Sequence, residues 1–292
     1  MTVIFGVAIG LSMSTTSFVA RRIGETAPDG AADSAVQSIL LGLLFSAVVA
    51  AVAITQAPAL LRLMGATPAV EGNARYTQVL LGGSASIFLL FLINAIFRGA
   101  GDATLAMRTL WIANGINIIL DPCLINGWGP FPRLGVLGAA VATTAGRSIG
   151  VLFHLWQLHS GKHRIVVERR HLHLNLPVLW KLLKVSLTGI LQFLVVTCSY
   201  LGLVRIVSSF GSAAIAGYTI AIRMIVFTIL PAWGLSNAAA TLGGQNLGAR
   251  KPARAEQAVY RTGFYTMIYM LIVSGAFLFF PATLVSIFSA EP

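Results

Sequence analysis

Eight apolar segments of about 20 residues or more run through this 292-residue chain and leave few choices of fold. An α-helix needs about 20 mainly apolar residues to cross the hydrocarbon core of a bilayer. The segments lie at residues 2–20, 36–57, 77–97, 105–126, 134–158, 179–208, 212–241 and 258–288. Because 57% of the residues are hydrophobic and only 10% are charged, we predict an all-α polytopic membrane protein with about eight transmembrane helices.

The basic residues fall mainly in alternate loops. One side holds Arg21, Arg22, Arg98, Arg108, Lys162, Arg164, Arg169, Arg170, Lys181, Lys184, Arg250, Lys251, Arg254 and Arg261, whereas the other holds Arg62, Arg75 and Arg133. The positive-inside rule places the first set in the cytoplasm. The net charge of +11 is therefore explained by basic residues that set the orientation of the chain in a lipid bilayer. No nucleic-acid partner is predicted. The pair Arg21-Arg22 follows the first apolar run, so that run is predicted to be a transmembrane helix and not a signal peptide.

An internal repeat appears at an offset of 224 residues. Gly10-Leu-Ser12, Gly24, Pro28 and Ala31 recur as Gly234-Leu-Ser236, Gly248, Pro252 and Ala255, and the stretch from Pro58 resembles the one from Pro281. Equivalent points are separated by an even number of spans, so the two units share one orientation, as in duplicated transporters. We expect an amino-terminal lobe at 1–160, a basic connection at 161–178 and a carboxyl-terminal lobe at 179–292. The comparison of the units predicts that one helix is missing from the first lobe and three from the second.

Asp121 is the only acidic residue predicted to lie inside the bilayer. The others, predicted in turns or at the chain end, are Glu25, Asp29, Asp33, Glu71, Asp102, Glu168, Glu256 and Glu291. A carboxylate at mid-span costs about 2.5 to 3.5 kcal/mol on insertion scales, which makes it a functional candidate. Asn117 lies four residues earlier and therefore on the same helix face. The pair can bind a hard cation or a proton, or it can form an interhelical hydrogen bond, and residue chemistry leaves both alternatives open.

Four motifs stand out in the chain: FRGAGDAT (97–104), NIILDP (117–122), GVLGAAVAT (135–143) and GLSNAAATLGGQNLGARKP (234–252). Together they resemble the multidrug and toxic compound extrusion (MATE) family of cation-coupled efflux transporters. The resemblance implies a V-shaped pair of six-helix lobes that alternates between outward and inward openings and exchanges sodium ions or protons for amphipathic, often cationic, compounds. It runs from the family's second helix to its ninth, so both lobes are expected to be incomplete.

By this resemblance the cation or proton site of the amino-terminal lobe consists of Asp121, Asn117, Asn94 and Thr143. Asn94 and Thr143 are also open to a simpler role in helix packing. Gln192 and Asn237 are candidates for a substrate cavity in the second lobe, with helix packing as the alternative. Many family members carry another acidic residue on the first helix, which this chain is expected to lack.

The remaining predictions concern partners and alternatives. The coupling ion, sodium or proton, is the only cofactor expected; Cys123 and Cys198 lie in apolar runs without a predicted disulfide, and the histidines are spaced too irregularly for a metal site. No catalytic residues are predicted, so the chain is not expected to be an enzyme. We expect a monomeric multi-pass protein of the cell membrane that acts on small organic molecules. The alternatives are a transport-incompetent fragment of an exporter and a flippase of lipid-linked sugars, for which only Arg147, Arg205 and Arg223 could bind phosphate.

Overall fold

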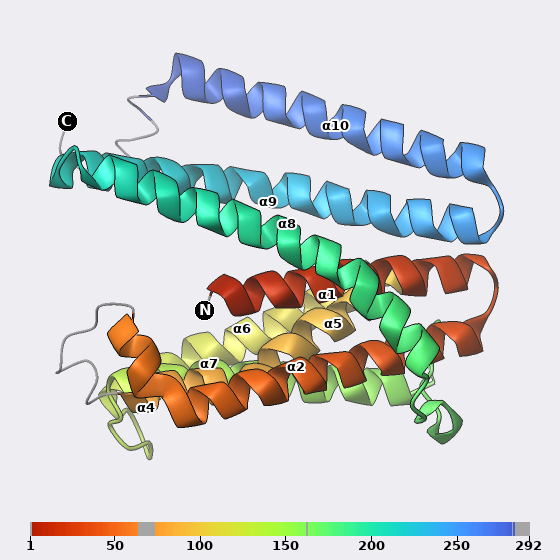
Figure 1. Cartoon of the computed structure of the whole chain (residues 1–292), viewed down its shortest axis with the longest axis horizontal. Helices are drawn as coiled ribbons and strands as arrows, with labels where there is room; N and C mark the ends of the chain where they lie inside the picture. Colours follow the sequence, from red (N-terminus) through yellow and green to blue (C-terminus); the bar gives the residue numbers. More distant parts are fainter. Residues whose placement is uncertain (1, 64–73, 162, 282, 284–292) are drawn as a thin grey trace.

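The computed structural model describes residues 2–63, 74–161, 163–281 and 283, and the regular structure in these ranges is entirely helical (Figure 1). The helices are α1 (Thr2–Gly24), α2 (Pro28–Leu63), α4 (Ala74–Gly82), α5 (Ser84–Ala100), α6 (Ala103–Asn126), α7 (Val136–His159), the 3-10 turn η1 (Arg169–His171), α8 (Leu176–Ser208), α9 (Ser212–Gly248) and α10 (Pro252–Phe279). Eight helical segments of the described chain are long and apolar enough to cross a membrane, with α4 and α5 together forming one of them.

The number and order of the predicted spans are confirmed, but several boundaries were wrong. α2 begins at Pro28 and α10 at Pro252, so Asp29, Asp33 and Glu256 lie in helices and not in turns. α8 begins at Leu176, inside the predicted connection. Each of these helices has a proline at or near its first residue, where the missing N–H is not needed. The apolar pattern located only the membrane-embedded part of each helix. Glu71, Glu291 and much of the repeat after Pro58 and Pro281 lie outside the described residues.

The helices form two groups that lie closest at one end, the right-hand end in Figure 1. α2, α4, α5, α6 and α7 form the first group, α8, α9 and α10 form the second, and α1 lies between them (Figure 1). α5 is the most deeply buried helix: Phe88, Leu92 and Phe97 are almost completely shielded. By contrast, Ala255 is the buried residue of α10 in the described structure. The apolar core therefore belongs to the amino-terminal lobe.

Small residues allow α1 to cross α8 and α9 closely. Gly10 faces Gly189 in α8, and a Cβ atom at Gly10 would lie 2.6 Å from the backbone nitrogen of Ile190. Next to this crossing, the hydroxyl groups of Ser14 and Ser186 form a hydrogen bond. At the end of α1 that carries Arg21 and Arg22, Gly24 contacts the backbone of α9 at Gln245. These glycines allow backbone contact between the lobes, as small residues commonly do between membrane helices.

The basic connection docks on the first turn of α2 and on the turn before α6, both in the amino-terminal lobe. His163 Nδ1 lies 3.0 Å from Asp102 Oδ2 in the turn before α6, and Arg170 donates to Asp29 at 2.8 Å. Gln37 of α2 accepts a hydrogen bond from the backbone N–H of Asn175, which also caps α8 by accepting from the N–H of Val178. The connection is therefore held against one lobe and leads directly into the first helix of the other.

Candidate functional site

Three of the predicted site residues lie together between α6 and α7. Asn117 Nδ2 donates to Asp121 Oδ1 at 3.3 Å and to Thr143 Oγ1 at 3.3 Å. The two hydrogens of one amide thus hold a carboxylate and a hydroxyl from different helices. Asn117 Oδ1 and Asp121 Oδ2 have no hydrogen-bond partner within the described ranges, so both oxygens are available to a ligand. Carboxylate, amide and hydroxyl oxygens are the donors that hard cations prefer.

Glycines in α7 create this arrangement. A Cβ atom at Gly146 would lie 2.7 Å from the carbonyl oxygen of Ala113, and one at Gly150 would lie 3.0 Å from the Cβ of Ala113. The spacing of these glycines is the small-xxx-small pattern of close membrane-helix packing. Because the backbones approach at Gly146, Thr143 comes within hydrogen-bonding reach of Asn117. Pro122 follows Asp121 inside α6 and cannot donate a backbone hydrogen bond to the preceding turn.

No described contact joins Asn94 to these three residues. Asn94 is buried in α5, where its Nδ2 donates to the carbonyl of Leu90 at 2.9 Å, while its Oδ1 is buried without a partner in the described structure. An unpaired buried acceptor costs free energy. The Oδ1 atom of Asn94 can therefore accept a hydrogen bond from water or a rearranged neighbour, or bind an ion. Its membership of the site stays a prediction.

The residues predicted for a substrate cavity are also separate from the set around Asp121. Gln192 lies exposed on α8. Asn237 of α9 donates to the carbonyl of Trp233 in its own helix at 2.9 Å. The hydrogen bond of Asn237 stays within α9, and no described contact places Gln192 or Asn237 in a cavity. The substrate role of both residues stays a prediction.

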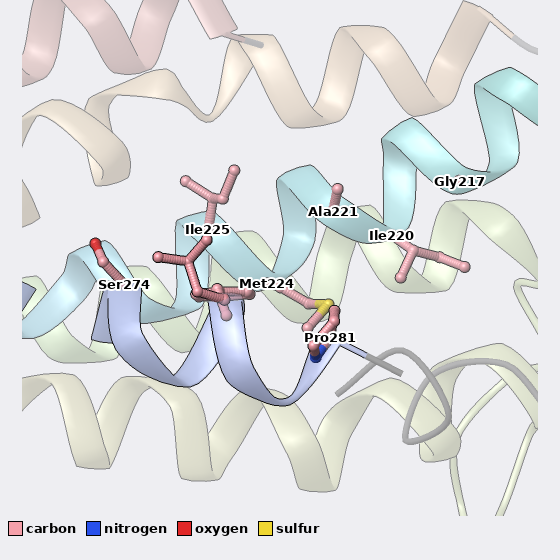
Figure 2. A pocket seen from close by; sticks show the side chains of 9 residues that line it. Gly217, Ile220, Ala221, Met224, Ile225, Ser274 and Pro281 are labelled. Atoms are coloured by element: carbon pink, nitrogen blue, oxygen red, sulfur yellow. The ribbon is translucent and has the colours of Figure 1, made fainter. Parts of the chain in front are cut away.

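An apolar pocket of about 530 Å³ lies between α9 and α10, within the carboxyl-terminal lobe (Figure 2). It contains none of the predicted site residues. Its lining comprises Gly217, Ile220, Ala221, Met224, Ile225, Ser274, Phe277, Leu278 and Pro281. Figure 2 shows that the lining residues come from both helices and that the Ser274 hydroxyl is a polar group in the lining. The lining offers no charge that would bind a coupling ion.

Two further polar residues, His154 and Gln245, contact other helices, and the sequence alone gave neither of them a functional role. His154 of α7 is completely buried, stacks on Phe97 and faces Thr109 through Nδ1 at 3.2 Å. Gln245 of α9 donates to the carbonyl of Gly99 at the end of α5. Both residues are polar side chains within apolar or glycine-rich runs, and this signal was visible in the sequence.

The fold and the polar set between α6 and α7 define a class: a multi-pass membrane bundle built from two similarly oriented helical units, of the kind used by secondary transporters. A family model described as MatE matches residues 1–123 and 189–292. The chain therefore belongs to the MATE family, and it is a multi-pass protein of the cell membrane.

Individual relatives agree with this assignment. The chain is 27% identical to the "Probable multidrug resistance protein NorM" of Thermotoga maritima, and the match covers 98% of this chain and 62% of that protein. It is 27% identical to the "FAD transporter" of Shewanella oneidensis, covering 99% of this chain and 64% of that protein. A crystal structure of a MATE protein in the bent conformation superposes with a TM-score of 0.90 at 29% identity, over 98% of this chain and 64% of the other. The chain thus spans less than two thirds of the length of these proteins.

Proposed function

We propose that the protein takes part in cation-coupled efflux, in which sodium ions or protons are exchanged for amphipathic organic compounds, often cationic, by alternating access. The observation that carries this proposal is the pair of hydrogen bonds from Asn117 to Asp121 and Thr143. They hold a carboxylate beside neutral oxygens between two membrane-spanning helices, α6 and α7. A carboxylate within a membrane span is costly and is commonly retained for ion or proton binding.

The same set supplies a coupling mechanism. A proton on Asp121 removes the charge that would bind sodium, so the two ions exclude each other. A cationic substrate in the same lobe is also repelled by a bound sodium ion. For cationic substrates, binding of the coupling ion therefore favours release, which is the competition that antiport requires. The names of the multidrug resistance relatives support export of organic compounds as the wider activity.

The contacts between the lobes support alternating access. α1 crosses α8 near its own middle, at Gly10, and its close contacts with α9 lie at the end that carries Arg21 and Arg22. A bundle whose two groups of helices meet mainly at one end can open there and close at the other, as rigid-body rocking requires.

Ethidium efflux from cells that lack their own pumps tests the proposal. We expect the chain to export ethidium and Asp121→Asn to reduce the export rate at least tenfold. Glu256→Gln is the matched control, because it removes an exposed carboxylate of α10 that makes no ion pair in the described structure. Sodium-free buffer and collapse of the pH gradient then identify the coupling ion. Export that is indifferent to Asp121→Asn overturns the site, and a chain that exports no ethidium at equal membrane abundance overturns the function.

A further inference from the structure

Arg147 is a cation near the middle of α7 (Val136–His159). It is eleven residues from one helix end and twelve from the other, which at 1.5 Å per residue places it about 16 and 18 Å from them. The hydrocarbon core of a bilayer is about 30 Å thick, so Arg147 lies too deep for its guanidinium to reach either headgroup layer by snorkelling. Its depth therefore needs another explanation.

Within the described ranges, the electrostatic neighbours of the guanidinium are two aromatic residues, Phe5 and Tyr76, and no carboxylate is among them. Its central carbon lies 5.7 Å from the centroid of the Phe5 ring in α1, and Phe5 in turn meets Phe91 of α5 edge-on at 5.8 Å. Within the described ranges, Arg147 makes no ion pair and no hydrogen bond. A guanidinium carries five N–H donors in a planar fork, and a ring face accepts none of them as a carboxylate would. Arg147 thus has its donors free beside an aromatic surface.

The position of Arg147 links it to the polar set. Thr143 is one turn earlier on α7, so the two side chains share a helix face. Thr143 accepts from Asn117, and Gly146 between them contacts the backbone of α6. A ligand that reaches Arg147 therefore lies in the amino-terminal lobe next to the proposed coupling site.

We propose that Arg147 binds the anionic group, a carboxylate or phosphate, of a substrate that also carries an aromatic ring, with Phe5 and Phe91 providing the apolar surface beside that group. The proposal rests on the proposed export function and adds a substrate class to it. An oxyanion fits the guanidinium fork through two parallel hydrogen bonds, and the water-poor interior of the bundle strengthens such a pair. An unpaired arginine at this depth is otherwise costly on insertion scales.

A matched pair of fluorescent ligands tests the proposal. Flavin mononucleotide and riboflavin share one aromatic ring system and differ by a phosphate group. Fluorescence anisotropy with the purified full chain in dodecyl maltoside, without added phospholipid, should show binding of flavin mononucleotide at least tenfold tighter than that of riboflavin. Arg147→Gln should abolish this preference. Arg261→Gln, which removes an exposed arginine of α10, should leave it unchanged.

Arg147→Lys provides a second, independent variant. It keeps the charge but loses the fork, so it should bind flavin mononucleotide several-fold more weakly than the unchanged chain and still prefer it to riboflavin. Equal binding of the two flavins by the unchanged chain, or a preference that survives Arg147→Gln, overturns the proposal. Displacement of flavin mononucleotide by phosphatidylglycerol but not by phosphatidylcholine would assign the site to a lipid headgroup and would also overturn it.

The binding test and the efflux test fail separately. Anisotropy measures binding without transport, so a chain that exports no ethidium can still show the preference for the phosphate. Conversely, equal binding of the two flavins leaves ethidium export and its dependence on Asp121 untouched.

Discussion

Gln245 in α9 donates a hydrogen bond of 3.0 Å from Nε2 to the carbonyl oxygen of Gly99 at the end of α5. This bond belongs to a set that completes the end of α5, because the last four carbonyls of a helix have no partner within it. Thr241 donates to the carbonyl of Arg98 at 3.2 Å, and Arg164 donates to that of Ala100 at 3.4 Å. The carboxyl-terminal lobe thus supplies two caps to the central helix of the other lobe. Opening at this end requires those caps to be exchanged for water.

Gln245→Ala should loosen this contact between the lobes. The net loss of one hydrogen bond is about 1 kcal/mol, so the amides of Gly101 and Asp102, which close the end of α5, should exchange with deuterium about fivefold faster. Hydrogen exchange followed by mass spectrometry of peptides covering these amides measures the effect. Asn246→Ala is the control, because Asn246 donates to Leu242 in its own helix. Equal acceleration in both variants would contradict a cap across the lobes.

Thr143→Val should weaken binding of the coupling ion. Valine keeps the shape of threonine but removes the oxygen that accepts from Asn117, so the amide is held by Asp121 alone. We expect the concentration of coupling ion needed for half-maximal ethidium efflux to rise about fivefold, in line with a loss of about 1 kcal/mol. Thr144→Val is the control, because Thr144 lies beside Gly83 at the break between α4 and α5. An equal shift in the two variants would remove Thr143 from the site.

The sequence predicted the features that depend on short stretches of chain. The eight spans follow from local hydropathy, and the pairing of Asn117 with Asp121 follows from their spacing of four residues on one helix. The contact of Thr143 depends in addition on the close approach of α7 at Gly146, which spacing alone does not give. The resemblance to the MATE family supplied that residue.

Contacts between distant segments were not predictable from the residues alone. Gln245 and Gly99 are 146 positions apart, and no periodicity links them. The same limit applies to Asn94, which the resemblance placed in the site but whose described hydrogen bond stays within α5. Helix ends were misplaced for a related reason: the polar first turns of α2 and α10 lack the apolar pattern that marked each span.

Glu25 should make a small, pH-dependent contribution to stability at the carboxyl-terminal end of α1. Burial raises the pKa of this carboxyl, but hydrogen bonds from Arg21 and Arg22 outweigh it and hold the pKa below its ordinary value of 4.5. Because the pKa is lowered on folding, the contribution is fully present above pH 4.5 and is lost as the pH falls through the lowered pKa. The pairs are solvent-exposed, so we expect less than about 1 kcal/mol.

Thermal unfolding of Glu25→Gln in detergent measures this contribution. The unfolding temperature should lie slightly below that of the unchanged chain at pH 7, and the two should converge as the pH falls through the lowered pKa of Glu25. Glu256→Gln should show no such convergence. A difference for Glu25→Gln that grows as the pH falls would contradict the assigned direction of the pKa shift.

Gly10→Val should destabilise the crossing of α1 with α8. A Cβ atom at Gly10 would lie 2.6 Å from the backbone nitrogen of Ile190, and a backbone atom cannot rotate away as a side chain can. The helices must separate, which also stretches the hydrogen bond between Ser14 and Ser186. Overpacking of this kind costs about 1 to 3 kcal/mol, or about 2 °C or more in unfolding temperature.

Gly202→Val separates packing from helix propensity in this test. Gly202 lies in α8, and a Cβ atom there meets nothing within 4 Å, so the variant carries the same intrinsic change without the clash. Only Gly10→Val should lower the unfolding temperature strongly. It should also reduce ethidium efflux, because α1 joins the lobes through this crossing and displacement of α8 disturbs the caps that α9 provides to α5. Equal unfolding temperatures for the two variants would show that the crossing can widen freely and that α1 does not fix the spacing of the lobes.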